Sequence, residues 1–444
     1  MTDSRSSASA PHRIVVVGGG AAGLELVTRL GDTLGRDGRA EITLVDRSRT
    51  HLWKPLLHSV AAGSLRRSQH ELNYLAQAHW HRFIYRYGCV AGIDRGAKLL
   101  QLGAMHDDEG REITPATVIP YDTLVMAIGS VTNDFGIPGA RQYAVPLESP
   151  EQATRFNRRL VNACLRAHAQ TDAIWPGQLH VAIIGAGATG TELAAELHRT
   201  VRAVIGYGLH RINPARDLHI VLIEAADRIL PALPERISRA TSVLLAALGI
   251  EVRTSARVAE VREDGVALAT GEFIPSELVV WSAGVKAPEV LADFGGLEAN
   301  RLNQLLVLPT LQTTRDPDIF AIGDCASVAR GEGRGTVPPR AQAAHQMAAH
   351  MHPQILRRLA GQPLRPFRYH DYGSLVALGP YRTLGTLMSR VIGRSLFVEG
   401  VFARLMHMSL YKRHEAALHG SAAVFWRAVV SAILQKLTPG VKLH

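Results

Sequence analysis

Residues 13–46 read RIVVVGGGAAGLELVTRLGDTLGRDGRAEITLVD. An apolar run is followed by a glycine turn, an amphipathic helix and a second apolar run, which is the order of a βαβ unit. Gly18 permits the tight turn, Gly20 lets the backbone approach a pyrophosphate, and Gly23 lets the helix pack on the sheet. Asp46 closes the second strand 23 residues after Gly23, where a carboxylate can hydrogen-bond an adenosine ribose. This stretch predicts a Rossmann-like dinucleotide-binding unit.

A second copy of the pattern begins 167 residues later, with HVAIIGAGATGTELAAEL at residues 180–197. Its turn glycines are Gly185, Gly187 and Gly190. A strand HIVLIE then ends at Glu224, 34 residues beyond Gly190 rather than the usual ~20, and the excess fits an insertion around residues 207–217. The plain alternative for either turn is an empty strand-to-helix connection, but two complete copies in one chain favour two dinucleotide sites.

The acid that ends this later strand predicts which nucleotide the second unit binds. Glu224 can accept hydrogen bonds from a free ribose 2′-hydroxyl and repels a 2′-phosphate, which favours NADH over NADPH. The nearby Arg228 weakens this prediction, because a guanidinium can pair with a phosphate.

Three further segments end in glycine or acid where such an architecture needs them. YDTLVMAIGS around Gly129 follows the first unit, and ELVVWSAGV around Gly284 follows the second, so each can bring backbone against a nucleotide. DIFAIGDCA supplies Asp324, whose carboxylate can hold a ribityl chain or a pyrophosphate oxygen. In this order the segments resemble the two-dinucleotide flavoproteins, in which an NAD domain is inserted into a discontinuous FAD domain.

A narrower resemblance rests on HLWKPLLHSVAAGSL at residues 51–65 and on VPPRAQAAHQMA at residues 337–348. Both are similar to segments of the type II NADH:quinone dehydrogenases, as are DYGSLVALG and EGVFARLMHMSLYKRHEAALHG near the C-terminus. The resemblance covers nearly the whole chain. It implies a bound FAD, NADH as the electron donor and a quinone as the acceptor.

The resemblance also implies roles for individual residues. Ala341 and Gln342 would lie near the flavin ring on the side where quinone docks, and Lys54 would lie near the FAD. Glu192, seven residues beyond Gly185, matches the position close to the nicotinamide carboxamide and the flavin.

Each of the proposed catalytic side chains has a plainer interpretation from the residues alone. Gln342 can be a helix-surface amide beside Gln346. Glu192 and Glu196 are spaced i and i+4, so either can merely place charge on a solvated helix face. Glu192 is favoured because it is nearer the phosphate-binding end of the helix.

Length and net charge limit the number of domains and the kind of partner that the protein can have. A chain of 444 residues divides into two or three domains of ordinary size. A net charge of +10 favours an anionic partner such as acidic lipid, nucleic acid or a phosphate-bearing cofactor. Because the sequence lacks a basic run with interleaved aromatic residues, nucleic-acid binding is not predicted.

Cysteine and histidine usage bears on the chemistry. The cysteines are Cys89, Cys164 and Cys325. None forms a CxxC pair, which argues against redox chemistry through a protein dithiol, and only Cys164 with Cys325 could serve sulfide chemistry. The histidines lack cysteine or acid companions at ligand spacing, so no metal site is predicted. The run His345, His350 and His352 is interpreted as surface or cap residues.

The C-terminal region predicts contact with a membrane surface. In SAAVFWRAVVSAILQKL at residues 421–437, Arg427, Ser431 and Gln435 recur every four positions and leave a wide apolar face. That pattern is typical of an interfacial helix, with a dimerisation or core-packing helix as the alternative. Because the chain lacks an apolar run of the ~18 residues that a spanning helix needs, any membrane contact is expected to be peripheral.

These observations predict an α/β protein with two Rossmann-like domains. A discontinuous FAD domain spans residues 11–172 and 286–385, an NAD domain spans 173–285, and a membrane-contact or dimer segment spans 386–444. The expected activity is non-pumping NADH:quinone oxidoreduction at the cytoplasmic side of the cell membrane. The alternatives are a related flavoenzyme whose acceptor is oxygen, a soluble carrier or sulfide-linked quinone chemistry, and a non-catalytic flavin redox sensor.

Overall fold

The computed structural model describes residues 10–331, 333, 335–379, 382–388, 395–400, 403, 406, 409, 412, 415 and 418. The chain separates into two compact units, each built from three segments. Unit 1 comprises Met1–Leu52, Glu71–Val131 and Lys286–Tyr369, and unit 2 comprises Trp53–His70, Thr132–Val285 and His370–His444. The domain boundaries expected from the sequence stay a prediction.

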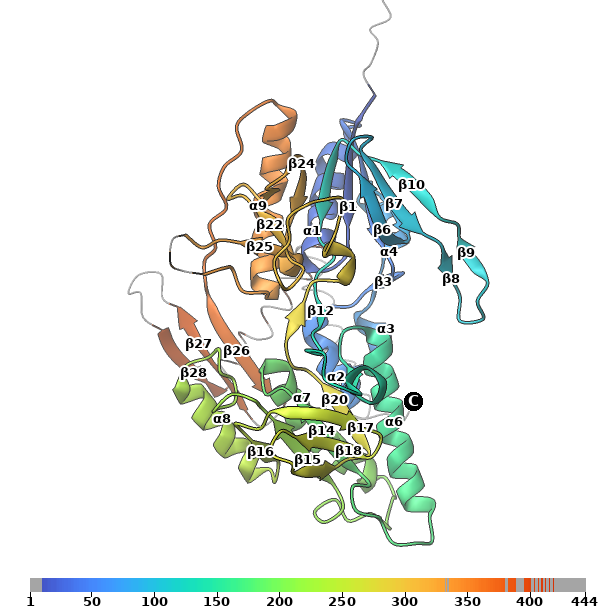
Figure 1. The fold of residues 1–444 in the computed structure, drawn as a ribbon, viewed down its shortest axis with the longest axis vertical. Coiled ribbons are helices and arrows are strands. Elements are labelled where there is room, and N and C mark those ends of the chain that lie inside the picture. The colour runs from blue at the N-terminus through green and yellow to red at the C-terminus, as the bar shows by residue number, and fades with distance from the viewer. Residues whose placement is uncertain are drawn as a thin grey trace, which may run out of the picture. The chain divides into compact units, whose positions relative to one another are not determined.

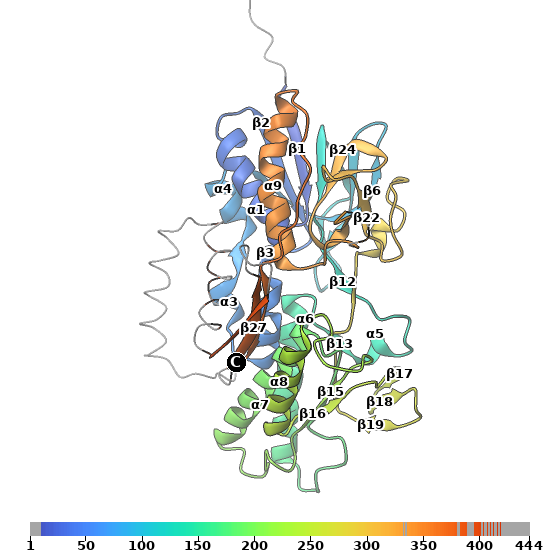
Figure 2. The ribbon, with the colours of Figure 1, turned by 90° about the vertical axis from the view of Figure 1, so that its left-hand side faces the viewer.

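Unit 1 is organised around an eight-stranded sheet of order β25-β22-β23-β24-β11-β1-β2-β5. Its strands are β1 (His12–Val17), β2 (Ala40–Asp46), β5 (Ile84–Tyr87), β11 (Thr123–Met126), β22 (Leu305–Val307), β23 (Gln312–Thr313), β24 (Asp316–Ala321) and β25 (Ala326–Val328). β1 pairs in parallel with both β2 and β11, and all three are apolar and buried, as expected of central parallel strands. The helices α1 (Ala21–Leu30) and α9 (Ala341–Leu359) pack together beside this sheet (Figures 1 and 2).

Smaller elements complete unit 1. A three-stranded antiparallel sheet has the order β10-β7-β6, and two further two-stranded antiparallel sheets pair β3 with β4 and β8 with β9. The bounds are η1 (Gly31–Gly35), β3 (Thr50–His51), β4 (Leu72–Asn73), α4 (Tyr74–Trp80), β6 (Cys89–Asp94), β7 (Leu99–Gly103), β8 (Met105–His106), β9 (Glu112–Thr114), β10 (Thr117–Pro120), η3 (Glu289–Leu291) and η4 (Gly323–Cys325). The short strands β12 (Val131–Thr132) and β21 (Val285–Lys286) lie where the chain passes between units.

Unit 2 contains a five-stranded parallel sheet of order β13-β20-β14-β15-β16. Its strands are β13 (Val145–Pro146), β14 (His180–Ile184), β15 (His219–Ile223), β16 (Glu251–Arg253) and β20 (Leu278–Trp281). The helices α7 (Ala188–Gly206) and α8 (Glu235–Ala247) lie on one side of it, and the antiparallel layer of β17 (Val258–Arg262), β18 (Gly265–Leu268) and β19 (Phe273–Pro275) lies on the other (Figure 2). With both glycine units in parallel sheets, the predicted α/β fold is confirmed.

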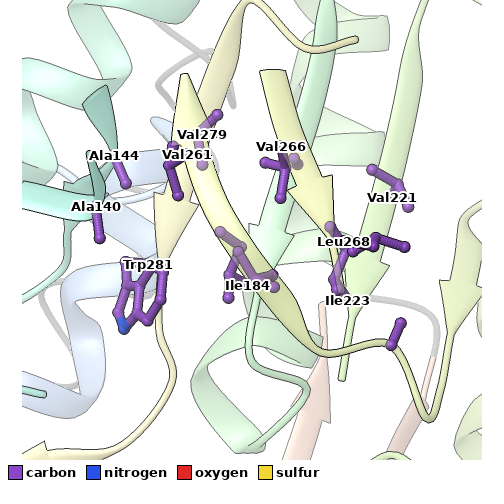
Figure 3. Packing of buried hydrophobic residues seen from close by; sticks show 13 residues of the cluster. Ala140, Ala144, Ile184, Val221, Ile223, Val261, Val266, Leu268, Val279 and Trp281 are labelled. Carbon is purple, nitrogen blue, oxygen red and sulfur yellow. The ribbon is translucent and has the colours of Figure 1, made fainter. Parts of the chain in front are cut away.

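The core of unit 2 lies between these two sheets (Figure 3). Ile184, Ile223 and Trp281 from the parallel sheet meet Val266 and Leu268 from the antiparallel layer, and all are at least 95% buried. Each such side chain contributes roughly 1.5–3 kcal/mol relative to exposure. Burial of these apolar side chains therefore explains why the antiparallel layer packs on the parallel sheet.

The rest of unit 2 consists of helices and a C-terminal sheet. They are η2 (Lys54–Leu56), α2 (Leu57–Ala62), α3 (Arg67–His70), α5 (Ala140–Tyr143), α6 (Pro150–Ala169), β26 (Gly373–Leu378), β27 (Arg382–Met388) and β28 (Ser395–Glu399). α2 packs against α6 and α7, and β26 contacts α7. Ser149 and Gln152 begin α6 with a reciprocal capping box, and such N-cap bonds typically stabilise a helix by about 1 kcal/mol.

The predicted interfacial helix at residues 421–437 lies outside the described residues. Among the described helices, none has both the length and the apolarity that crossing a bilayer requires. Among the residues that the structure describes, no three histidine, cysteine or acidic side chains lie close enough together to hold a metal ion.

Candidate functional site

The first glycine turn makes an open cradle at the carboxyl end of β1. Gly18 adopts a φ of 102°, and its backbone N–H donates to Val45 O at 2.7 Å. A Cβ on Gly23 would lie 1.8 Å from Gly18 O, so only glycine lets α1 approach the turn this closely. A Cβ on Gly20, the N-cap of α1, would meet nothing within 4 Å. The space beside this helix N-terminus therefore suits a phosphate group.

The second glycine turn repeats this geometry in unit 2. Gly185 adopts a φ of 101°, and its N–H donates to Ile223 O at 2.8 Å. A Cβ on Gly190 would lie 2.0 Å from Gly185 O, while a Cβ on Gly187 would meet nothing within 4 Å. The sequence thus produces two cradles with the same backbone.

The two strand-ending acids are held in matching positions. Asp46 accepts hydrogen bonds from Gly19 N at 2.5 Å and Ser48 N at 2.7 Å. Burial raises the pKa of its carboxyl, and the backbone hydrogen bonds act against that rise. In the same way Glu224 accepts from Ala186 N and Ala226 N, both at 2.9 Å. Each carboxylate is fixed at the edge of its cradle, where it can accept hydrogen bonds from ribose hydroxyls.

Arg228, the residue that weakened the nucleotide prediction, is held by its own loop. Its guanidinium donates to Leu233 O and to Pro231 O, both at 2.8 Å. These bonds turn the cation toward the loop carbonyls, so a free 2′-phosphate would have to compete with them.

Asp324 lies beside the carboxyl end of a neighbouring strand in unit 1. Ser130 Oγ donates to its carboxylate at 2.8 Å, and Gln304 Nε2 donates to its backbone carbonyl at 2.9 Å. Gly129, next to Ser130, has a φ of 73° and open space at its Cβ position. β11 and β24 are adjacent parallel strands, which explains why segments 194 residues apart meet here. Ser130 and Gln304 were not predicted, and only the position of Ser130 beside Gly129 offered a signal.

Gly284 follows β20 in unit 2 and has a φ of 65°. A Cβ there would lie 2.4 Å from the ring of Phe135, and Asn133 N donates to Gly284 O at 3.3 Å. The close neighbour of this glycine in the structure is thus an aromatic ring of its own chain.

The N-terminal end of α9 carries Ala341 and Gln342, both half-buried. One turn further, His345 Nδ1 lies 2.6 Å from Glu25 of α1, whose other oxygen accepts from Arg29 at 2.8 Å. The interpretation of His345 as a surface or cap residue is wrong, because its side chain is only 25% exposed and pairs with a buried acid. The sequence interval of 320 residues hid this contact.

Glu192 occupies the first turns of α7 and is buried rather than solvated. Its Oε1 accepts from Ala377 N at 2.9 Å, and its Oε2 lies 3.5 Å from His58 Nδ1. Burial raises the pKa of this carboxyl, and the nearby His58 lowers it. The Glu196 side chain is only 12% exposed, so the solvated-face interpretation of this pair is wrong. Lys54, in η2, is exposed.

Comparisons with known proteins cover both cradles. A family model described as pyridine nucleotide-disulphide oxidoreductase matches residues 12–348. A type II NADH:quinone oxidoreductase of Haemophilus influenzae is 40% identical over 97% of this chain and 99% of its own. The type II NADH:quinone oxidoreductase Ndh of Mycobacterium tuberculosis is 28% identical over 85% of this chain and 80% of its own.

A solved structure shows the same fold. NDH2 of Plasmodium falciparum in complex with NADH aligns with a TM-score of 0.80 at 18% identity, over 97% of this chain and 100% of that one. The sulfide:quinone oxidoreductase of Aquifex aeolicus aligns with a lower TM-score of 0.70, over 95% of each chain.

Proposed function

The chain belongs to the type II NADH:quinone oxidoreductases, within the pyridine nucleotide-disulphide oxidoreductase family, and from this premise we propose that it passes electrons from NADH through FAD to a membrane quinone without pumping protons. The observation that carries the proposal is the repeated cradle, present in both units with the same backbone and a fixed carboxylate. FAD, when bound, supplies the redox chemistry by its own electronics.

FAD binding is assigned to unit 1. The cradle of Gly18, Gly20 and Gly23 accepts the pyrophosphate, and Asp46 receives the adenosine ribose. Asp324, oriented by Ser130, together with the open backbone at Gly129, receives the ribityl and pyrophosphate portion. Lys54 stays a predicted FAD contact.

NADH binding is assigned to unit 2, with Gly185, Gly187 and Gly190 at the pyrophosphate and Glu224 at the ribose. The fixed carboxylate repels a 2′-phosphate, and Arg228 is held by loop carbonyls. Both observations support NADH over NADPH. Gly284 stays a predicted contact of this nucleotide.

Three residues are proposed to orient the reacting groups. Glu192, at the nucleotide end of α7, holds the nicotinamide carboxamide, which a buried carboxyl can do as acceptor or, when protonated, as donor. Ala341 and Gln342, at the N-terminal end of α9, are assigned to the quinone side of the flavin. The contribution of Ala341 and Gln342 is positional, because the flavin itself carries the electrons.

The membrane contact is proposed for the C-terminal segment, on the cytoplasmic side of the cell membrane. From residue 401 to 444 the sequence has six lysines and arginines and one acid. Each cation near an anionic surface adds roughly 1 kcal/mol of attraction. The same segment can also form a homodimer contact, since an amphipathic face serves either purpose.

Sulfide-linked quinone chemistry is one of the alternative activities. The raised pKa values of the two candidate thiols argue against it. Burial raises the pKa of Cys164 to about 11 and that of Cys325 to about 12. Both are therefore neutral at physiological pH and poor nucleophiles.

An anaerobic titration of the purified protein tests the proposal. NADH should bleach the flavin absorbance at far lower concentration than NADPH, and a short-chain quinone should restore the absorbance. In the presence of excess NADH and quinone the protein should turn over steadily. A protein reduced once that then stops is a redox sensor, and one that oxygen reoxidises while quinone does not is a different oxidoreductase.

A further inference from the structure

A line of buried polar groups runs beside α7 in unit 2. His58, from α2, lies between two carboxylates, with Nδ1 3.5 Å from Glu192 Oε2 and Nε2 4.0 Å from Glu196 Oε2. Ser64 Oγ donates to Glu196 Oε2 at 2.9 Å. The side chains of the histidine and the two acids are 7%, 9% and 12% exposed, so the line is largely shielded from water.

Two elements lie next to this line: α6, which packs on α2, and β26, which contacts α7. The buried face of α6, which packs on α2, is apolar apart from the Cys164 thiol, which is neutral because burial raises its pKa to about 11. β26 supplies the backbone N–H of Ala377, which donates to Glu192. The titratable side chains of the line itself are His58, Glu192 and Glu196.

Imidazole suits the middle of such a line. One ring nitrogen can take a proton while the other releases one, which makes histidine an effective proton shuttle. Distances of 3.5 and 4.0 Å exceed a strong hydrogen bond, but such contacts are often long without substrate and tighten in the complex. Glu192 is at the nucleotide end of the line, and Glu196 with Ser64 is at the other.

The proposed function creates a demand for one proton. NADH and a quinone yield NAD⁺ and a quinol, and NADH supplies two electrons and one of the two hydrogens. The second hydrogen enters as a proton from water, so each quinone reduced consumes one. A buried acid that gives up this proton must be reprotonated before the next turnover.

We propose that His58 passes protons from Glu196 to Glu192, so that Glu192 is reprotonated once for each quinone reduced. This rests on the proposed function and adds a positioning and proton-transfer role for a residue that does not itself touch the substrates. Glu196 is the outer proton donor of the line, and Ser64 fixes its carboxylate.

The test compares His58→Gln holoenzyme with wild type by anaerobic stopped flow. Bleaching of the flavin by NADH should stay within about 2-fold of wild type, while reoxidation by a short-chain quinone should slow by roughly 10-fold or more. The slowed reoxidation should recover as the pH is lowered, because acidic water then protonates Glu192 directly. His219→Gln, the same exchange at an exposed site in unit 2, should behave as wild type.

Glu196→Gln provides a second route to the same answer if His58→Gln folds poorly. It should slow reoxidation in the same selective way, by about 3-fold, since water partly replaces the outer donor. Wild-type reoxidation in both variants, or equal slowing of both half-reactions, would overturn the proton-transfer role. If NADH bleaches the wild-type flavin but quinone does not restore it, the proposed function fails first and takes this inference with it.

Discussion

The two glycine turns, GGGAAG at residues 18–23 and GAGATG at residues 185–190, have the same backbone although they lie in different units. Gly18 and Gly185 share a φ near 101°. In both turns the third glycine leaves room for only a hydrogen, and the strand-ending acid accepts from the turn. Binding a pyrophosphate depends on backbone N–H groups and a helix N-terminus, so the backbone is what repeats.

A glutamate lies two residues after the third glycine in both turns, but the partners of the two glutamates differ. Glu25 in unit 1 pairs with the Arg29 guanidinium and lies beside the imidazole of His345. Glu192 in unit 2 has a backbone N–H and His58, and burial raises its pKa. The first acid therefore connects α1 to α9 in unit 1, whereas the second is a buried carboxyl with a raised pKa.

Replacing the third glycine of either turn should have the largest effect. Gly23→Ala would force a Cβ to within 1.8 Å of Gly18 O, which should destabilise unit 1 by about 3 kcal/mol and abolish FAD retention. Gly190→Ala should instead leave a yellow protein that NADH no longer reduces. Flavin content and thermal unfolding distinguish the two results. Gly20→Ala is the matched control, because its Cβ meets nothing and should cost flavin affinity without costing stability.

Exchanging the strand-ending acid should give the next largest effect. Glu224→Ala removes the group that repels a 2′-phosphate, so the ratio of kcat/KM for NADH over NADPH should fall by roughly 10- to 100-fold. Asp46→Ala, the equivalent change in unit 1, should reduce FAD affinity and leave that ratio unchanged in whatever protein retains flavin. An unchanged ratio in Glu224→Ala would remove the acid from the specificity assignment.

The two helix acids should respond in opposite ways to amide replacement. Glu25→Gln breaks a buried ion pair and should lower the free energy of unfolding by roughly 2 kcal/mol with little kinetic change. Glu192→Gln should slow turnover by about 10-fold at nearly unchanged stability.

The sign of the pH dependence follows from the raised pKa of Glu192. Between the unfolded and the raised folded pKa the native state binds more protons, so stability contributed by this group falls as pH rises through that window. Denaturant unfolding at a series of pH values gives the free energy of unfolding. In Glu192→Gln this free energy should no longer fall with rising pH across that window. A steeper fall in the variant would contradict the assignment.

The smallest expected effect concerns an ion pair at the edge of unit 1. Arg13 holds the pKa of Asp122 down to about 2 by side-chain hydrogen bonding. A depressed carboxyl pKa stabilises the fold above the unfolded value, and this contribution is lost as pH falls toward 2. Asp122→Asn should therefore lose well under 1 kcal/mol at neutral pH, and the difference should vanish in acid. Denaturant unfolding at both pH values provides the measurement.

Local chemistry explains how much of the site could be predicted. The glycines and Asp46 and Glu224 were found because a tight turn, a close helix and a strand end each impose requirements within one short stretch. Residues that complete the site were missed because their contacts join distant segments. Ser130 reaches Asp324 over 194 residues, and Ala377 reaches Glu192 over 185.

The amino-acid sequence by itself determined two dinucleotide cradles, the strand-ending acid of each and the family to which they belong. Steric limits on glycine and the order of strand, turn and helix act over a few residues, so they can be recognised in one dimension. Only the tertiary structure decided that Glu25 meets His345 while Glu192 meets His58. Those pairings depend on which helices pack together. Packing is driven by the burial of apolar surface, which is non-directional. It therefore does not specify which polar groups come into contact.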